Sequence, residues 1–234
     1  MEKPVCAVVG VGPGNGAAIA RRFAAEGYAV ALVARSAGFI EALAGEVGPP
    51  ARAYPCDAAE PAELERAFKS IRDELGNVEV LVYNAGSGVW GTVEEITPDA
   101  FEISWRVNAL GALVSAQQVI PMMKRRGQGT IVYIGATASR RGGPKSAGFS
   151  SAKGAQRLLA ESMARHLWPA GLHVALVIVD GVVDLPRTRE RMPDRPDEFF
   201  VRPEDVAASV VSIVKQPRSA WSFEVEARPF GETW

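Results

Sequence analysis

Short apolar runs alternate with longer amphipathic stretches along most of this chain, and this alternation restricts the fold more than any other feature. The apolar runs, rich in Val, Ile and Ala, occupy residues 5–9, 29–34, 78–84, 130–135 and 173–180. Each is apolar throughout, as expected of parallel strands that helices cover on both faces. The stretches with helical spacing occupy residues 14–26, 61–75, 98–126 and 148–168. The pattern predicts strand–helix–strand units and a parallel sheet.

Composition narrows the class of protein further. A chain of 234 residues with 47% apolar content is large enough for one sizeable core, so we expect a single domain over residues 1–234. The 26 Lys and Arg nearly balance the 27 Asp and Glu, without long blocks of one sign. Such a charge pattern does not favour nucleic acid or a membrane surface as a partner. No apolar run approaches the roughly 20 residues of a membrane span, and we expect a cytoplasmic protein.

The cysteines do not indicate a special site. Cys6 and Cys56 each stand next to a predicted strand. Two cysteines in a chain of this length make neither a disulfide framework nor a metal site. We expect both to be buried as small apolar side chains and expect no bound metal.

Two segments near the C-terminus are less regular. Residues 185–200 are dense in Pro, Arg and Asp, which predicts a surface loop flanking a pocket, here called the substrate loop. Its arginines, Arg187, Arg189, Arg191 and Arg195, could hold an anion, but neighbouring acids nearly cancel them and favour a solvated mixed surface. Residues 221–234 alternate as a final strand and tail. Their aromatic side chains, including Trp234, suit packing against another subunit or within the chain.

A glycine-rich turn follows the first apolar run. It reads Gly10-Val11-Gly12-Pro13-Gly14-Asn15-Gly16 and leads at once into a helical pattern. Glycines at a strand-to-helix turn let the backbone come close to a diphosphate, whose charge the helix N-terminus stabilises. Its place after the first strand of a repeating strand–helix pattern favours nucleotide binding over a simple tight turn.

Four features in order and spacing resemble the motifs of the short-chain dehydrogenase/reductase family. They are the glycine turn, Asn84-Ala85-Gly86, Asn108 and Lys153. The resemblance runs from about residue 5 to 184, although Val9 replaces the usual threonine before the first glycine. It implies a Rossmann-type doubly wound sheet of about seven mostly parallel strands, binding a nicotinamide dinucleotide, in a homodimer or homotetramer. The expected cofactor residues are Gly10, Gly12, Gly14, Asn15, Gly16, Arg35, Asp57, Ala58, Asn84, Ala85, Gly86, Lys153, Gly181 and Val183. Asp57 matches the family's adenine-contacting aspartate, and its other interpretation is an N-cap for the helix that begins near Pro61.

The second predicted strand bears on the choice of cofactor. It ends in Val33-Ala34-Arg35-Ser36, with Ala34 where the family's NAD-selecting aspartate would stand. An acid there would bind a free ribose hydroxyl and repel a 2′-phosphate, whereas a guanidinium can bind the phosphate. Arg35 therefore favours NADP(H) over NAD(H). The family's second marker, a basic residue before Gly14, is absent because Pro13 stands there.

The expected active site lacks two hydroxyl groups. In similar enzymes a tyrosine, a lysine, a serine and an asparagine act together at the substrate oxygen. Lys153 and Asn108 match the lysine and asparagine, but Phe149 stands at the tyrosine position and Ala136 at the serine position. A phenyl ring has no proton to give, and general acid–base help is typically worth about 10² to 10⁴ in rate.

Nearby groups could replace the missing hydroxyls. Thr137 is the best candidate because a strand terminus can bulge and redirect one side chain. Ser150 lies about 100° around the helix from Phe149 and is expected to turn away. Asp180 and Asp184 stand near the nicotinamide end, where loop capping is their more conservative interpretation. Trp90 suits a pocket, an interface or the core.

Two hypotheses remain at this point. The first is an NADP(H)-dependent oxidoreductase that acts on the carbonyl/alcohol pair of a small-molecule substrate through a non-standard active site. The second is a catalytically weak or inactive nucleotide-binding protein with an interaction or sensing role. The intact cofactor frame with Asn108 and Lys153 favours the first, whereas Ala136 and Phe149 together motivate the second.

Overall fold

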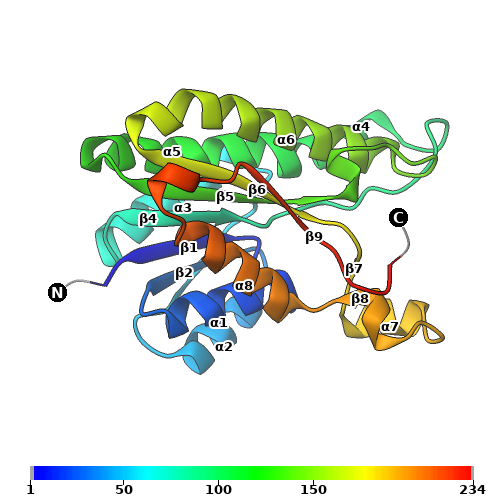
Figure 1. The fold of residues 1–234 in the computed structure, drawn as a ribbon, viewed down its shortest axis with the longest axis horizontal. Coiled ribbons are helices and arrows are strands. Elements are labelled where there is room, and N and C mark those ends of the chain that lie inside the picture. The colour runs from blue at the N-terminus through cyan, green and yellow to red at the C-terminus, as the bar shows by residue number, and fades with distance from the viewer. Residues whose placement is uncertain (1–2, 233–234) are drawn as a thin grey trace.

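The chain folds into a doubly wound α/β domain, as the alternating pattern predicts. The computed structural model describes residues 3–232. Within them, one parallel sheet has seven strands in the order β3-β2-β1-β4-β5-β6-β9 (Figure 1). In chain order these are β1 (Val5–Val9), β2 (Ala29–Ala34), β3 (Arg52–Pro55), β4 (Val78–Tyr83), β5 (Gly129–Ala136), β6 (Leu172–Val179) and β9 (Glu224–Ala227).

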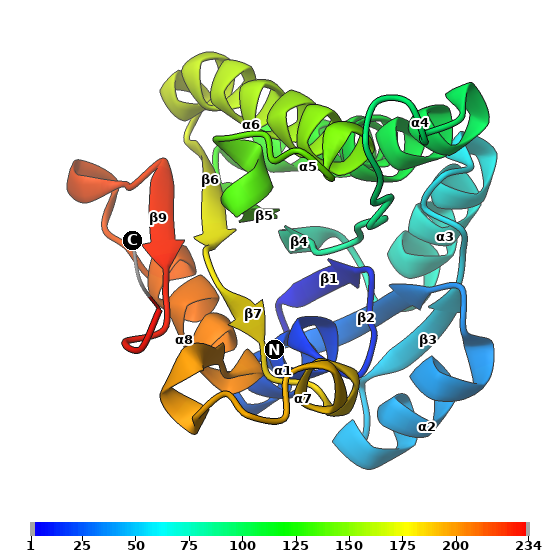
Figure 2. The same cartoon turned by 90° about the vertical axis from the view of Figure 1, so that its right-hand side faces the viewer.

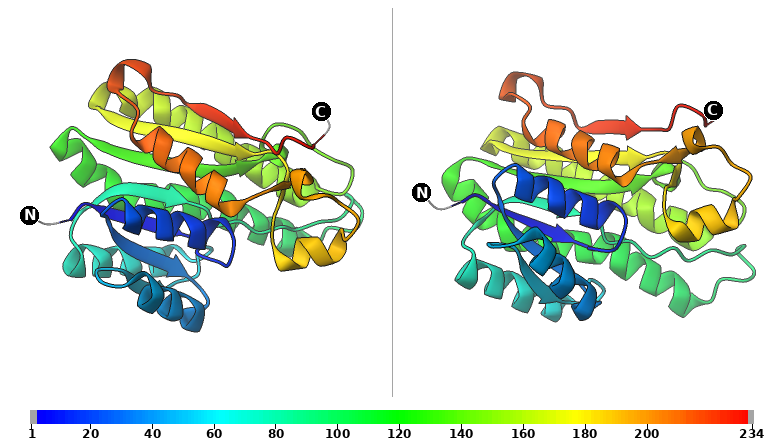
Figure 3. Two further views of the ribbon diagram at one scale, coloured as in Figure 1. Left: turned by 60° about the horizontal axis from the view of Figure 1, so that its bottom comes forward. Right: turned by 90° about the horizontal axis from the view of Figure 1, so that it is seen from below.

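Helices cover both faces of the sheet and divide the core into two layers. Figure 3 shows one face covered by α1 (Asn15–Ala25), α2 (Ala37–Val47) and α8 (Pro203–Val214), with α8 beside α1. The opposite face is covered by α3 (Pro61–Glu74), α5 (Gly111–Arg126) and α6 (Ala147–Leu167). The central strands are buried throughout because each supplies side chains to both layers.

The helical pattern at residues 98–126 forms two helices instead of one. They are α4 (Pro98–Trp105) and α5, joined by a π-helical turn at Arg106–Leu110. Asn108 lies in this turn and is fully buried. Such turns widen a helix locally and often occur at functional sites.

Two helices lie outside the sequence prediction. The segment of α2 contains two glycines, which weaken a helical pattern. The segment of α8 is rich in Val and Ile, and these residues favour strands by propensity. Packing on the sheet decides both cases, since α2 buries Ile40 and Leu43, and α8 buries residues such as Val206.

The substrate loop is more ordered than the sequence suggests. It contains the short helix α7 (Pro186–Arg191) and a 3₁₀ turn at Asp197–Phe199, which the prediction of a surface loop did not include. A two-stranded parallel ribbon, β7 (Val182–Val183) with β8 (Phe200–Val201), closes the segment at its base. Arg189 pairs with Asp184 at 2.7 Å and with Asp197 at 2.7 Å, so this arginine is neutralised within the segment.

The aromatic side chains before β9 pack mainly within the chain. Trp221 stacks on His173, with ring centroids 4.7 Å apart, and meets Trp168 edge-on. Phe223 packs against the core, whereas Phe230 is 94% exposed. Trp234 lies outside the described residues. No helix within residues 3–232 is both long and apolar enough to cross a membrane.

The strands of the main sheet end at one common edge, which faces the viewer in Figure 2. The glycine turn after β1, the segment after β4, the 3₁₀ turn after β5 and the ribbon after β6 all lie at this edge. Open α/β sheets bind ligands at the carboxyl ends of their strands. The candidate functional site therefore lies at this edge.

Candidate active site

The glycine turn is shaped by close packing. Gly10 has a φ of +91°, and a Cβ added to it would lie 2.3 Å from the backbone N of Ala85. A Cβ on Gly16 would lie 2.6 Å from the carbonyl O of Gly10. Gly12 differs because an added Cβ would meet nothing within 4 Å. The turn is therefore tight on its inner side and open at Gly12, where a diphosphate could approach the backbone.

Asn84 fastens the segment after β4 to this turn. Its Nδ2 donates a hydrogen bond of 2.7 Å to the carbonyl O of Gly10. Two residues on, a Cβ added to Gly86 would lie 3.4 Å from Asn108 Oδ1 and 3.7 Å from Lys153 Nζ. The Asn84-Ala85-Gly86 motif therefore lies between the glycine turn and the predicted catalytic pair.

Unpaired hydrogen-bond acceptors occur near the glycine turn and near the predicted catalytic pair. Oδ1 of Asn15, at the start of α1, and Oδ1 of Asn108 are buried and have no hydrogen-bond partner among the described residues. Buried acceptors of this kind usually bind a donor from water or a ligand. Together with the open space at Gly12, they fit a dinucleotide with hydroxyl and amide donors.

Three residues expected on the adenine side lie near one another. Nη1 of Arg35 is 3.9 Å from Oδ2 of Asp57, and the Arg35 side chain is 77% exposed. Asp57 Oδ1 accepts a bond of 2.9 Å from the backbone N of Ala59, so Asp57 stabilises its own turn and does not cap α3. Ala58 is buried beside them. Arg35 thus has a free approach from solvent toward a ribose phosphate.

The segment after β6 meets the glycine turn from the other side. A Cβ on Gly14 would lie 2.8 Å from Cδ2 of Leu185, so the substrate loop begins directly over the turn. Gly181 is covered by the C-terminal tail, because a Cβ there would lie 2.6 Å from Cδ of Pro229. Val183 lies in β7 and pairs with Val201.

Lys153 is held in a buried polar cluster. Its Nζ donates 2.8 Å to the carbonyl O of Ile134 and 3.1 Å to Oε1 of Gln156. Nε2 of Gln156 donates 2.9 Å to the carbonyl O of Asn108. Burial lowers the pKa of the Lys153 amine from 10.5 to about 7. A neutral amine has two N–H donors, and these two acceptors satisfy both.

Gln156 joins the two predicted catalytic residues, and the sequence analysis missed it. It is fully buried and lies three residues after Lys153, one turn along α6. A buried glutamine on an apolar helix face was the signal that could have found it, because buried polar groups need partners.

Phe149 lies next to Trp90. Their ring centroids are 5.1 Å apart at an interplanar angle of 43°. Phe149 is half-buried, whereas Trp90 remains 66% exposed, so Trp90 belongs to the surface of the site and not to the core. Phe149 and Trp90 therefore form an apolar pair at the position where the sequence analysis expects the missing phenol.

The nearby serines bond to the backbone or to one another. Ser150 Oγ lies 2.6 Å from Ser146 Oγ, and Ser151 Oγ donates 2.8 Å to the carbonyl O of Ala147. Ser139 Oγ accepts 3.1 Å from the backbone N of Ala136. These contacts agree with the expectation that Ser150 turns away from Phe149.

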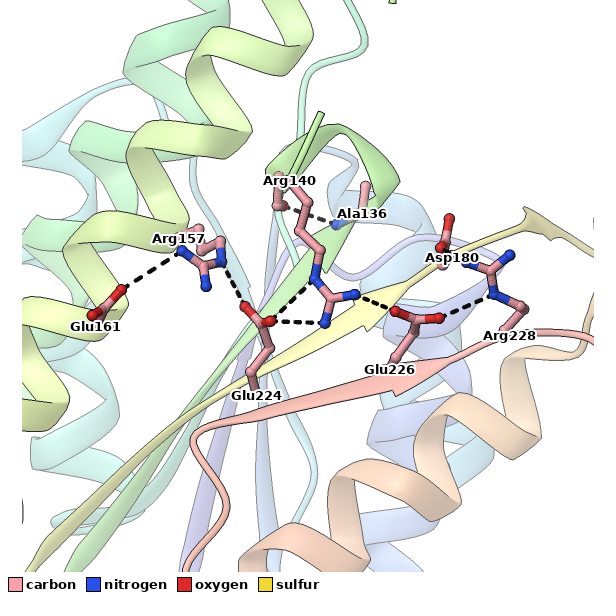
Figure 4. Close-up of polar contacts among 9 residues, drawn as sticks. Ala136, Arg140, Arg157, Glu161, Asp180, Glu224, Glu226 and Arg228 are labelled. Carbon is pink, nitrogen blue, oxygen red and sulfur yellow. Dashed lines mark hydrogen bonds and ion pairs between the residues drawn. The ribbon is translucent and has the colours of Figure 1, made fainter. Parts of the chain in front are cut away.

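Thr137 has a different partner. Its Oγ1 donates a hydrogen bond to Oδ1 of Asp180, and Oδ2 of Asp180 accepts from Nη2 of Arg228. Figure 4 shows Asp180 and Arg228 at the end of a series of charged side chains that reaches α6. Asp180 is 4% exposed, so it is a buried carboxylate at the carboxyl edge of the sheet.

Comparison with known proteins agrees with this arrangement. The family model described as short chain dehydrogenase matches residues 4–196. The reductase MabA of Mycobacterium tuberculosis, named as acting on 3-oxoacyl-[acyl-carrier-protein], is 32% identical over 182 residues, covering 78% of this chain and 70% of MabA.

Solved structures show the same likeness over nearly the whole chain. A short-chain dehydrogenase from Rhodopseudomonas palustris is 33% identical with a TM-score of 0.83, covering 97% of this chain and 99% of its own. A metagenomic short-chain oxidoreductase, solved with NADP, is 25% identical with a TM-score of 0.85 and covers 99% of both chains.

Proposed function

The chain belongs to the short-chain dehydrogenase/reductase family of oxidoreductases, and on that basis we propose that it uses NADP(H) to interconvert a carbonyl and an alcohol at a non-standard active site. The observation that carries this proposal is the cluster of Asn108, Lys153 and Gln156 beside Gly86, next to an open glycine turn. A protein that had lost nucleotide chemistry altogether would have no need to keep a costly buried amine there.

The proposed cofactor is NADP(H). Gly12 and Asn15 would receive the diphosphate, Asn108 and Lys153 would meet the nicotinamide end, and Arg35 would bind the 2′-phosphate. Support for the last role comes from the exposed guanidinium of Arg35 at the end of β2 and from the absence of an acid at Ala34. The complex of the metagenomic relative with NADP is in keeping with this choice.

The bound nicotinamide would supply the hydride donor or acceptor. In its protonated form Lys153 has a third N–H besides those that bond to Ile134 and Gln156, and this donor would orient the cofactor and stabilise charge that develops nearby. Gln156 would hold the amine in position. Phe149 and Trp90 would form an apolar wall that excludes water and contacts an apolar part of the substrate. We also propose that the substrate loop at 185–200 borders this pocket and that the protein assembles as a homodimer or homotetramer.

One observation favours the alternative of a nucleotide-binding protein with little catalysis. Phe149 and Trp90 pack against each other with their rings tilted by 43°, and in the proposed register they take the place of a proton-donating phenol although neither ring can supply that proton. In that case the site would bind NADP(H) and change its affinity for a partner.

A panel of ketones, aldehydes and alcohols, followed by the absorbance of the reduced nicotinamide, tests the proposal. Turnover by the purified protein with NADP(H), abolished in Lys153→Ala, is the expected result. Tight NADPH binding in calorimetry without turnover of any compound would leave only the alternative.

Restoring the missing hydroxyls gives a sharper version of this experiment. The double variant Ala136→Ser with Phe149→Tyr is expected to gain about 10² or more in rate with a ketone substrate if the scaffold is competent. The matched control is Ala138→Ser, which adds a hydroxyl in the same turn but not at a family position. An equal gain in the control would contradict the assigned register.

A further inference from the structure

Thr137 and Asp180 are 43 residues apart in the sequence, and the fold brings them into contact where β5 and β6 end. The register of these strands pairs Ala136 with Val179, so Thr137 and Asp180 are the next residue on each chain segment. Oγ1 of Thr137 donates to Oδ1 of Asp180. The contact therefore follows from the strand register and lies at the edge of the sheet that binds ligands.

The Asp180 carboxylate is held from its other side by Arg228. Arg228 also donates 3.0 Å from Nε to Oε1 of Glu226, whose Oε2 accepts from Nη1 of Arg140 (Figure 4). Arg140 in turn donates 2.7 Å to Oε1 of Glu224 on β9. A buried carboxylate that is oriented through successive ion pairs keeps one oxygen directed at its neutral partner, the Thr137 hydroxyl.

Thr137 stands beside the position of the absent serine. It follows Ala136 directly, and Lys153 Nζ bonds to the carbonyl O of Ile134, two residues earlier on the same strand. The hydroxyl bonded to Asp180 thus lies one residue past the end of the strand whose Ile134 carbonyl anchors the predicted catalytic lysine.

We propose that Thr137 and Asp180 act as a paired proton acceptor for an alcohol substrate, in place of the hydroxyl missing at Phe149. This inference rests on the proposed function. A hydroxyl that donates to a carboxylate is polarised toward losing its proton, as in other nucleophile–base and base–orienter pairs. Thr137 would touch the substrate, and Asp180 would act through Thr137.

The proposed step balances as follows. With the oxidised cofactor bound, the nicotinamide would supply the acceptor for the hydrogen and electron pair of the substrate carbon, while the substrate O–H bond would break and the C=O bond would form. Thr137 Oγ1 accepts the released proton and passes its own proton to Asp180. The carboxyl group then releases that proton to solvent, and the reverse sequence protonates the alkoxide in reduction.

Other charged groups face Asp180 and bear on its charge. Nη2 of Arg141 lies 3.9 Å from Oδ1. Glu232 of the C-terminal tail is close enough that Asp180 contributes to the raised pKa of the Glu232 carboxyl, for which burial is the larger cause. The charged groups that face Asp180 are therefore the guanidinium groups of Arg228 and Arg141 and the carboxyl group of Glu232.

The test uses Thr137→Val, Thr137→Ser and Asp180→Asn, with Thr130→Val as the matched control. Thr130 is a buried threonine on the same strand, near its opposite end. Two readouts are compared: kcat with the best alcohol of the panel, and binding of trifluoroethanol to the NADP⁺ complex by tryptophan fluorescence. Calorimetry gives the affinity of each variant for NADP⁺ alone.

We expect Thr137→Val and Asp180→Asn to lower kcat by about 10² or more. They should weaken trifluoroethanol binding about tenfold while NADP⁺ affinity stays within about threefold of wild type. Thr137→Ser should restore both readouts to near the wild-type values, and Thr130→Val should change neither. If Thr137 had only a structural role, Thr137→Ser and Thr137→Val variants of equal thermal stability would have equal kcat.

Several results would contradict the proposed role of Thr137 and Asp180. Unchanged kcat and unchanged trifluoroethanol binding in Thr137→Val and Asp180→Asn would do so while leaving the oxidoreductase function intact. If the wild type turns over no substrate, the proposed function fails, and trifluoroethanol binding still decides whether Thr137 and Asp180 receive an alcohol hydroxyl. Absence of such binding in wild type counts against the pair.

Discussion

At the scale of single residues, Lys153 shows how burial changes chemistry. The sequence identifies it as the partner of the residue at 149, four positions earlier. The structure adds that its amine is enclosed and bonded only to neutral acceptors, Ile134 O and Gln156 Oε1. A low-dielectric site without a carboxylate favours the neutral form, which is why its pKa falls to about 7.

The lowered pKa of the Lys153 amine therefore predicts that the stability of the protein depends on pH. Because the pKa of its amine is lower in the folded than in the unfolded chain, the unfolded state binds more protons between about pH 7 and 10. The free energy of unfolding should thus rise with pH in that window, by at most an amount on the order of 5 kcal/mol. Below the window both states are protonated, and the destabilisation is fully present.

Urea unfolding of wild type and Lys153→Met across this window checks the prediction. Subtracting the free energies of unfolding of the two proteins cancels the contributions of other titrating groups. The stability of wild type relative to Lys153→Met should increase as the pH rises. A constant difference would mean that the amine stays charged in the folded protein.

Arg35 carries the prediction of cofactor choice. Arg35→Ala should weaken NADP⁺ binding by about tenfold or more, since it removes charge-assisted bonds to the 2′-phosphate, and should hardly change NAD⁺ binding. Isothermal titration of both nucleotides measures this. Arg165→Ala, which removes an equally exposed arginine from α6, is the control. Equal losses for NAD⁺ and NADP⁺ would contradict the role of Arg35.

At the scale of elements, the approach of α5 to the adenine side depends on Gly111. A Cβ there would lie 2.2 Å from the carbonyl O of Ala58 and 2.4 Å from Oη of Tyr83. The first residue of α5 thus packs directly on the turn expected to hold the adenine. A glycine at this helix start has a packing function that its sequence context does not reveal.

Gly111→Ala should destabilise the protein by about 2 kcal/mol, because the backbone on one side of the new methyl cannot move away cheaply. Gly154→Ala is the matched control within α6, where an added Cβ meets nothing within 4 Å. That change should stabilise by about 0.5 to 1 kcal/mol through the lower entropy of the unfolded chain. Chemical denaturation measures the free energy of unfolding of both variants. A change of the same sign in both would contradict the packing argument.

At the scale of the whole molecule, the charged side chains in Figure 4 tie the last strand to the site. Glu224 of β9 accepts from Arg157 on α6 at 2.6 Å and from Arg140 at 2.7 Å, with its side chain 17% exposed. The series continues through Glu226 and Arg228 to Asp180. The final strand thus helps to orient a carboxylate at the opposite end of its own length.

Glu224→Gln should lower the free energy of unfolding by about 1 to 3 kcal/mol, since two partly buried guanidinium groups lose their shared carboxylate. The exposed pair of Arg21 and Glu46 offers the control, and Glu46→Gln should have no measurable effect. Thermal unfolding at low and high salt compares the two. Equal effects would show that burial adds nothing to the Glu224 contacts.

The sequence alone determined the layered fold and the family, and it predicts the cofactor residues. Apolar runs with intervening helical spacing specify buried parallel strands, and the glycine turn, Asn84-Ala85-Gly86, Asn108 and Lys153 are local motifs whose order identifies the family. Counting along the chain from these motifs also predicts that hydroxyls are missing at Ala136 and Phe149. The segment of α8 was missed because its local propensity favours a strand and only packing on the sheet makes it a helix.

Only the tertiary structure decided which polar groups meet. Gln156 reaches Asn108 across 48 residues, Thr137 reaches Asp180 across 43, and Arg228 reaches Asp180 across 48. None of these pairs has a spacing that a helix or a turn would impose. They depend on strand register, on the π-helical turn and on the path of the final strand, which are set when separate elements pack into one core.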